Sequence, residues 1–374
     1  MTNGTAIVLG ANAGQADLIR YLKERDWHVT AVSGRQVGDP GETLAHEFVK
    51  LDIRDIDAVS ELAREKKAEI VYSISSDVAI TAATEVSEKL GLPHFFDSGL
   101  VDVFNKKPLL REFLNSRNLS PVAFAEVTSA DQASDWSVFP CVVKPTDAQG
   151  QRGVQKVFDK AHLAEAIEIA IDACKEPKSA IIEAFLEGVE ISCNVLVSDG
   201  ELVVSELSER LVHTGANFGI PTGHLIPIVH VPEHFVREAG KLVEDVTRAL
   251  GIKDGTLYYQ MIVTPDGPRI VEIAPRLDGC HVWRLIKAAR DIDFLDGAVR
   301  RLTGESVARQ KGRNDPGAVY ELMFQQMPPG KPFDKGQFPV PEDALYHEYR
   351  YQQGQPVVPV NGRLEVVGYY VRKR

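Results

Sequence analysis

Cysteine is scarce in this chain of 374 residues, which contains only Cys141, Cys174, Cys193 and Cys280. The four are far apart and form no C-x-x-C pair, so neither a disulfide framework nor a cysteine-rich zinc site is indicated. We therefore expect a reducing, cytoplasmic setting.

Positive charge is also in deficit. The chain has 42 Lys and Arg against 53 Asp and Glu, a formal net charge of −11. Nucleic acids and anionic membranes both favour an excess of Lys and Arg, so the charge argues against either partner. Anionic small molecules stay compatible, because they need only a few local cations.

Long apolar runs are missing as well. No stretch approaches the roughly 20 residues that span a bilayer, and the apolar segment 5–10 is too short for a signal peptide and lacks a basic segment before it. The sequence has no G-x-S-x-G motif, so no covalent serine nucleophile is evident. The length allows two or three domains with a sizeable core.

What the chain does contain begins with an alternation of strands and helices. We expect strands at 5–10, 28–33, 47–52 and 69–75, and helices at 14–26, 56–67 and 78–91. Such alternation predicts a parallel sheet with right-handed crossovers, a Rossmann-like domain over residues 1–104.

The pattern changes after residue 104. We expect helices at 107–118, 161–174 and 233–250, a short strand at 141–145, and antiparallel hairpins at 190–207 and 256–274. The first hairpin turns at Asp199-Gly200, a strong hairpin signal. This part is α+β. From about residue 311 Pro and Gly become dense, which predicts a loop-rich C-terminal piece ending in a strand at 364–373.

The glycine-rich segment 10–15 follows a strand and opens a helix, as dinucleotide-binding turns do. However, Asn12 stands where the second glycine would let a pyrophosphate approach, and no acid follows the second strand. Three hypotheses are open: a tight structural turn, which the spacing favours, a contribution to a substrate site, or NAD binding. A nicotinamide oxidoreductase would rest on this segment alone.

A second glycine-rich segment is more informative. Lys144 ends an apolar strand and is followed by Gly150 and Gly153. A lysine fixed at a strand end presents a point charge, and glycine-rich backbone brings N–H groups close to phosphate oxygens. The alternative is a surface loop beside a lysine that extends into solvent.

Four motifs follow one another along the chain: "NKKPLLREFLNSRNLSPVAF", "FPCVVKPTDAQGQRGV", "IIEAFLEGVE" and "YYQMIV…RIVEIAPR". Taken in order, they resemble the ATP-grasp ligases, of the carboxylate–amine or amino-acid ligase type, related to the ATP-grasp domains of biotin carboxylase and carbamoyl-phosphate synthase. The resemblance implies an N-terminal Rossmann-like parallel-sheet domain, then an ATP-grasp fold with antiparallel sheets over 105–310. It also implies a lid at about 121–187 and a C-terminal subdomain over 311–374.

The resemblance implies an ATP site. It assigns the phosphates to Lys107, in preference to Lys106, and to Lys144, with Gly150 and Gly153 in the covering loop. It assigns adenine to a hinge and the ribose hydroxyls to one acid. The hinge and ribose residues are Glu183, Ala184, Phe185, Leu186 and Glu190.

The resemblance also implies a metal site. Glu272 would hold Mg²⁺, with Mn²⁺ as an alternative, and Arg276 would face the reacting phosphoryl group. Two positions depart from the family, since Gln260 stands where an acid is usual and Ala274 where Asn is usual. Mg²⁺ binds through Glu272, Gln260, water and ATP, or Asp278 substitutes for the missing acid, or the site is degenerate.

Three further residues are candidates for substrate contact. His224 lies in a G-H-x-x-P segment similar to one in amino-acid ligases, and an ordinary loop histidine is the alternative. Asp278 and His281 follow Arg276, where an acceptor would arrive, although His281 also fits a helix start.

The function implied is an ATP- and Mg²⁺-dependent ligase that joins a small-molecule carboxylate to an amine through an acyl-phosphate. A homodimer is expected from the resemblance alone. The rival hypothesis is a degenerate ATP-grasp protein acting as a nucleotide-binding regulatory or scaffold module. A biotin-dependent carboxylase shares the fold, but no A-M-K-M-type segment is present.

Overall fold

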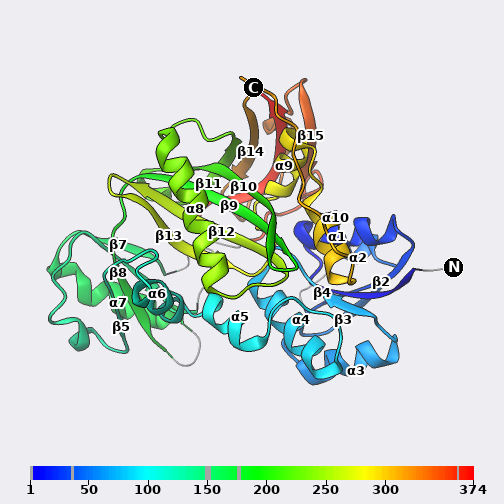
Figure 1. The fold of residues 1–374 in the computed structure, drawn as a ribbon, viewed down its shortest axis with the longest axis horizontal. Helices are drawn as coiled ribbons and strands as arrows, with labels where there is room; N and C mark the ends of the chain where they lie inside the picture. The colour runs from blue at the N-terminus through cyan, green and yellow to red at the C-terminus, as the bar shows by residue number, and fades with distance from the viewer. Residues whose placement is uncertain (1–2, 35–37, 148–152, 175–177, 360–361) are drawn as a thin grey trace.

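The strands in the described part of the protein form three sheets, of four, eight and four strands. The computed structural model describes residues 3–34, 38–147, 153–174, 178–359 and 362–374. In the view of Figure 1 the N-terminal sheet and the small sheet that follows it lie on opposite sides, with the eight-stranded sheet between and above them.

The N-terminal sheet is parallel, in the order β3-β2-β1-β4. Its strands are β1 (Gly4–Leu9), β2 (Trp27–Ser33), β3 (Glu47–Lys50) and β4 (Ile70–Tyr72). Its helices are α1 (Ala13–Lys23), α2 (Pro40–Leu44), α3 (Ile56–Glu65) and α4 (Asp77–Leu90).

Alternation along β1 sends its side chains into two different cores. Ala6 and Val8 pack with Leu18 and Leu22 of α1. On the other face, Ile7 and Leu9 pack with residues of α3 and α4. Buried on both faces, β1 reads as the continuous apolar run expected of a central parallel strand.

Two helices lead to the small antiparallel sheet, whose order is β5-β8-β6-β7. The helices are α5 (Ser98–Asn105) and α6 (Lys107–Ser116), and α7 (Leu163–Ala173) packs on the sheet. The strands are β5 (Phe124–Val127), β6 (Cys141–Pro145), β7 (Gln155–Val157) and β8 (Ala180–Ala184), with short 3₁₀ turns at Ala130–Ala133 and Lys160–His162.

The large sheet has the order β13-β12-β9-β10-β11-β14-β16-β15 and is antiparallel throughout its described pairings. Its strands are β9 (Val189–Ser198), β10 (Glu201–Val212), β11 (Pro221–Ile226), β12 (Gly255–Thr264), β13 (Gly267–Ala274), β14 (Tyr320–Met327), β15 (Ala344–Tyr349) and β16 (Glu365–Lys373). The helices are α8 (Glu233–Ala249), α9 (Val282–Arg290) and α10 (Phe294–Leu302), with 3₁₀ turns at Gly215–Asn217 and Lys335–Gln337.

The two faces of the large sheet belong to two cores. Cys193 and Val195 of β9 pack with Val243 of α8. On the opposite side, residues of β14, β16, α9 and α10 share one core with α1 and with β1 and β2. This shared core joins the N-terminal sheet to the large sheet, so the elements that meet there form one hydrophobic unit.

The predicted fold class is confirmed: a parallel sheet comes first and antiparallel sheets follow. The Asp199-Gly200 turn forms as predicted, with φ of +54° and +81° at its two central residues. The C-terminal piece differs from the prediction, because it contributes three strands to the large sheet where only one was expected.

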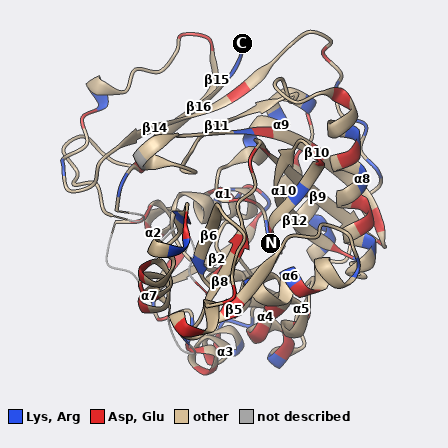
Figure 2. Ribbon diagram, turned by 90° about the vertical axis from the view of Figure 1, so that its left-hand side faces the viewer, with Lys and Arg blue, Asp and Glu red and all other residues tan. Residues whose placement is uncertain are grey.

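None of the helices in the described parts of the chain combines the length and the apolar character needed to cross a membrane. Over the same residues, Lys and Arg are interspersed with Asp and Glu on several helices (Figure 2).

Candidate functional site

Two lysines meet Glu272 where the small sheet, α6 and the large sheet come together. Lys107 is the first residue of α6, Lys144 lies on β6, and Glu272 lies on β13. Burial lowers the pKa of Lys107, and the charge of Lys144 lowers it further, whereas Glu272, Glu183 and Asp147 act to raise it. Three separate elements thus bring together residues predicted to bind phosphates and metal.

Glu183 on β8 is the anion of this region. Its carboxylate accepts a hydrogen bond of 2.8 Å from Arg111 Nε and forms an ion pair with Lys144. Burial alone would raise the pKa of Glu183, but the two cations lower it to about 2. The carboxylate therefore fixes Lys144, and the predicted adenine contact of Glu183 stays a prediction.

Arg111 was not singled out from the sequence, yet it is among the largest fully buried side chains. Besides Glu183 it binds the carbonyl oxygen of Ile270 at 2.9 Å, so it ties α6 to both β8 and β13. Its one local signal is its position a helical turn after Lys107.

The predicted hinge directly follows β8. The N–H groups of Ala184 and Phe185 donate to the carbonyl oxygens of Ala123 and Pro140, which anchors the segment up to Leu186. The ring of Phe185 lies 5.9 Å from that of Phe218, and Lys156 Nζ lies 3.4 Å from its centroid. Contacts of this hinge with adenine stay a prediction.

Glu190, Gln260 and Glu272 lie on three adjacent strands. Gln260 of β12 is paired in register with Glu272 of β13. Its Nε2 donates to Glu190 Oε2 at 3.0 Å, and Glu190 also forms an ion pair with Arg210 of β10. No local pattern in the sequence predicts that Arg210 pairs with Glu190. Ribose binding by Glu190 stays a prediction.

The donor set is compatible with Mg²⁺ only if ligands outside the protein contribute. Gln260 donates its N–H₂ group to Glu190, so its carbonyl oxygen is the atom left for an ion. Its register partner Glu272 supplies a carboxylate, and both groups are oxygen ligands of the kind that Mg²⁺ prefers. Across the described ranges, no three His, Cys, Asp or Glu side chains form a metal-binding group. The residues therefore fit an ion that takes its other ligands from phosphates and water.

Arg276 forms an ion pair with Asp77, the first residue of α4 in the N-terminal part of the chain. Its Nε and one terminal nitrogen donate to the two carboxylate oxygens of Asp77 at 2.7 and 2.8 Å, and the other donates to Leu277 O at 3.2 Å. Asp77 begins α4, 199 positions away in the sequence. The contact of Arg276 with a phosphoryl group stays a prediction. Such a contact would have to form while Arg276 is paired with Asp77, or replace that pair.

Asp278 is fully buried just before α9. Its Oδ1 accepts N–H groups from Cys280 at 2.5 Å and Val282 at 3.2 Å, whereas its Oδ2 has no hydrogen-bond partner. Burial raises the pKa of Asp278 to about 6, even though these N–H groups and Arg276 act to lower it.

His281 and His224 are also buried. His281 stacks on Tyr369 with ring centroids 4.5 Å apart, and has φ of +58° as it begins α9. His224 on β11 approaches Ser208 Oγ at 3.3 Å, and burial together with the Arg210 charge lowers its pKa to about 3. The imidazole is enclosed and its Nε2 has no hydrogen-bond partner among the described residues, and substrate contact by His224 stays a prediction.

The two glycine-rich segments differ in what the structure describes. Gly150 lies outside the described residues. Gly153 has φ of +69°, and a Cβ there would lie 2.8 Å from the side chains of Ala173 and Pro145. In the segment 10–15, the side chains of Gln15 and Ser75 fill the space around Gly10 and Gly14, as expected of a structural turn.

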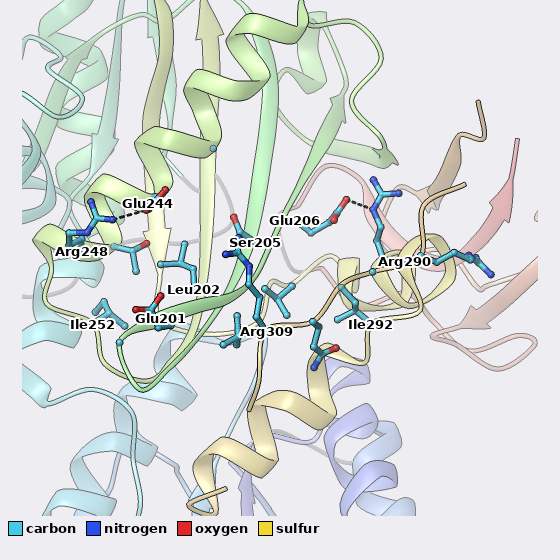
Figure 3. A pocket seen from close by; sticks show the side chains of 18 of the residues that line it. Glu201, Leu202, Ser205, Glu206, Glu244, Arg248, Ile252, Arg290, Ile292 and Arg309 are labelled. Carbon is cyan, nitrogen blue, oxygen red and sulfur yellow. Dashed lines mark hydrogen bonds and ion pairs between the residues drawn. The ribbon is translucent and has the colours of Figure 1, made fainter. Parts of the chain in front are cut away.

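A cavity of about 650 Å³ lies elsewhere, between the β9–β10 hairpin, α8 and the segment 309–314. Figure 3 shows Glu206 paired with Arg290, and Glu244 with Arg248, at its wall. None of the predicted site residues lines it.

Comparison with known proteins identifies relatives of part of the chain. Residues 137–283 match the ATP-grasp domain family. Over 166 residues the chain is 32% identical to the carbamoyl phosphate synthase large chain of Thermus thermophilus, which covers 43% of this chain and 14% of that protein. Over 131 residues it is 33% identical to the D-alanine–D-alanine ligase of Flavobacterium johnsoniae, a match that covers 33% of this chain and 39% of that protein. The chain thus spans about a seventh of the first relative and well under half of the second.

Solved structures match the whole chain at low identity. The L-amino acid ligase of Bacillus licheniformis superposes with a TM-score of 0.82 at 16% identity, covering 100% of this chain and 94% of that one. The N5-carboxyaminoimidazole synthetase of Staphylococcus aureus, complexed with ADP, superposes with a TM-score of 0.77 at 17% identity. The match covers 100% of this chain and 94% of that one. At such identity the likeness shows the fold.

Proposed function

Because this chain carries an ATP-grasp domain and has the ATP-grasp fold, we propose that it is an ATP- and Mg²⁺-dependent carboxylate–amine ligase. One observation carries the proposal: Lys107, Lys144 and Glu272 converge from α6, β6 and β13 on one place. The similarity to D-alanine–D-alanine ligase and to an L-amino acid ligase supports this reaction class.

In the proposed reaction the two lysines hold the triphosphate of ATP. Their charges oppose those of the phosphate oxygens, and Lys144 would leave Glu183 for the stronger anion. Glu272 and the Gln260 carbonyl would hold Mg²⁺, which neutralises phosphate charge when bound. Glu183 to Leu186 and Glu190 would bind the nucleoside.

The chemistry proposed needs no protein nucleophile. A substrate carboxylate oxygen attacks the γ-phosphorus, the bond to the β,γ-bridging oxygen breaks, and ADP leaves. Arg276, which carries a permanent charge, would stabilise the acyl-phosphate. The amine then attacks the acyl carbon, inorganic phosphate leaves with the bonding electrons, and the amine nitrogen loses a proton to solvent.

Phosphate release tests the proposal. Purified protein with Mg²⁺ and ATP would be screened against pairs of amino acids, hydroxy acids and sugar acids. Lys144→Ala should lower kcat/KM for ATP by about two orders of magnitude, because it removes a fixed charge from the phosphates. Lys160→Ala, an exposed lysine of the same small-sheet unit, is the matched control and should change little. Unchanged release in Lys144→Ala would contradict the assignment.

A second candidate function follows from Gln260 and Ala274, which leave Glu272 as the single carboxylate on the β12–β13 pair at this position. The protein would then be a nucleotide-binding regulatory or scaffold module. This alternative predicts a nucleotide-dependent rise in melting temperature without turnover across the whole substrate screen.

A further inference from the structure

Several buried polar atoms near the start of α9 lack a hydrogen-bond partner. Among the described residues they include Arg210 Nε, Asp278 Oδ2, His281 Nδ1 and Arg350 Nε. The charges of Asp278, Arg210, Arg350 and Arg276 all act on the thiol of Cys280, so all four lie within electrostatic range of that thiol. Buried polar groups without partners are rare in folded proteins, so each of them calls for a partner such as a water, an ion or a ligand.

Arg350 is the unexplained cation of this cluster. It follows β15 and is anchored by its backbone N–H to Val367 O at 2.8 Å. Its guanidinium forms no hydrogen bond or ion pair with a described residue. The carboxylate whose charge reaches it, Glu348, is already bound to Arg20, Tyr346 and Tyr369. Arg350 is half-buried, but its Nε is enclosed without a partner, which is unfavourable, and desolvation lowers the pKa of Arg350.

The charges around Cys280 balance in pairs, with two exceptions. Arg210 is neutralised by Glu190, and Arg276 by Asp77. Arg350 and Asp278 are left, one positive and one negative. Asp278 is held rigidly by two N–H groups through one oxygen and presents the other without a partner, and it makes no bond to Arg350.

We propose that Arg350 and Asp278 bind the two charged ends of a zwitterionic amino acid, the carboxylate on Arg350 and the ammonium on Asp278. The planar guanidinium matches a carboxylate through two parallel hydrogen bonds, and the Asp278 oxygen accepts from an ammonium. A ligand with a carboxylate but no amine would leave Asp278 without a partner, and a ligand with an amine but no carboxylate would leave Arg350 without one. This inference rests on the proposed function, in which the amino acid is one of the two ligase substrates.

The test is direct binding by calorimetry in the presence of Mg²⁺ and a non-hydrolysable ATP analogue. The probes are the twenty common L-amino acids, β-alanine and γ-aminobutyrate. For each amino acid that binds, its methyl ester and the corresponding acid without the amine follow. At least one amino acid should bind saturably, and both of its one-charge analogues should bind about 10- to 100-fold more weakly.

Three variants locate the subsite. Arg350→Ala should lose about 10- to 100-fold in amino-acid affinity, and Arg350→Lys should lose less. Asp278→Asn should weaken the amino acid but not the acid that lacks the amine. Arg374→Ala, which removes an exposed arginine just after β16, is the matched control and should bind as wild type does. If Arg350→Ala does not fold, the other two variants carry the test.

The outcomes separate this inference from the proposed function. Two results would overturn the subsite. One is equal amino-acid affinity in wild type, Arg350→Lys and Asp278→Asn. The other is a wild-type protein that binds the nucleotide but binds none of the amino acids. Amino-acid binding that needs Arg350, with no phosphate release for any acid and amine pair, overturns the ligase and leaves the subsite.

Discussion

At the scale of single residues, four cations in and around the candidate site are each paired with an acid from another part of the chain. Glu183 holds Arg111 and Lys144, Glu190 holds Arg210, and Asp77 holds Arg276. The partners are 72, 39, 20 and 199 positions apart. The sequence shows that charged residues are present, but no local pattern shows which of them meet.

The two adjacent lysines at the start of α6 give the sharpest residue-scale prediction. Lys106 is exposed and bonds Asp102 at 2.7 Å, whereas Lys107 faces Glu272, Glu183 and Lys144. We expect Lys107→Ala to weaken nucleotide binding by about 10- to 100-fold, because it removes a cation from the phosphates. Nucleotide titration by calorimetry measures this, with Lys106→Ala as the matched control. A larger loss in Lys106→Ala would reverse the assignment.

Asp278 gives a prediction about pH. Its pKa is raised from 3.8 to about 6, so folding disfavours its charged form. Protonation in the native state therefore adds stability as pH falls from about 6 to about 4, and this contribution is absent above pH 6. Asp278→Asn keeps an oxygen for the two N–H groups and removes the charge.

We therefore expect Asp278→Asn to be more stable than wild type at pH 8, on the order of 3 kcal/mol, with the gap narrowing towards pH 4. Urea midpoints at pH 4, 6 and 8 measure it. A gap that does not change with pH would show that Asp278 does not titrate in this range. The same variant should also bind the amino acid more weakly. Higher stability together with weaker binding is expected when a residue serves binding at a cost in stability.

At the scale of elements, the β12–β13 hairpin is the part of the site that sequence patterns predict best. Its two strands and its turn at 264–267 form as expected, and the register places Gln260 opposite Glu272. Both hairpins carry strong local turn signals, which is why they were predictable. Whether this hairpin binds a metal ion therefore depends on one neutral side chain, Gln260, whose position opposite Glu272 is known.

Gln260→Glu tests that side chain. A second carboxylate opposite Glu272 should lower the Mg²⁺ concentration needed for half-maximal phosphate release by about tenfold, because ligand charge sets divalent affinity. Without metal it should destabilise the protein, since a third acid would join Glu190 and Glu272. Gln352→Glu, at an exposed position, is the control. An unchanged Mg²⁺ dependence would show that residue 260 is not a ligand.

The C-terminal strands show where sequence patterns fail. β14 contains Gln325 and Gln326 in its second half and lacks the alternation of a half-buried strand, and dense Pro and Gly follow it. β15 is short and mostly exposed or half-buried. Both strands form because neighbours in the large sheet supply their hydrogen bonds, and that tertiary context leaves no local signal. For the same reason Arg350 went unnoticed.

At the scale of the whole molecule, the N-terminal sheet and the large sheet are joined in two ways. One is the shared apolar core of α1, α9, α10 and their strands. The other is the buried ion pair of Asp77 and Arg276, whose side chains are only 9% and 10% exposed. Because Arg276 is paired with Asp77 of α4 and also feels the charge of Glu272, this pair links the N-terminal part of the chain to the candidate site.

Breaking that pair should be costly. Asp77→Asn leaves Arg276 charged and buried, so we expect a loss of about 3–5 kcal/mol in unfolding free energy, measured by urea denaturation. Asp102→Asn, which breaks an ion pair whose side chains are 57% and 50% exposed, should lose under about 1 kcal/mol. Similar losses in the two variants would show that the Asp77 pair does not stabilise the contact between the sheets.

A crystal structure with Mg²⁺ and a non-hydrolysable ATP analogue would test the proposed phosphate and metal sites most directly. We expect phosphate oxygens within hydrogen-bond distance of both Lys107 and Lys144, and a metal ion on Glu272. A nucleotide bound instead in the cavity beside Arg290 and Arg309, with Lys144 still paired to Glu183, would contradict this expectation.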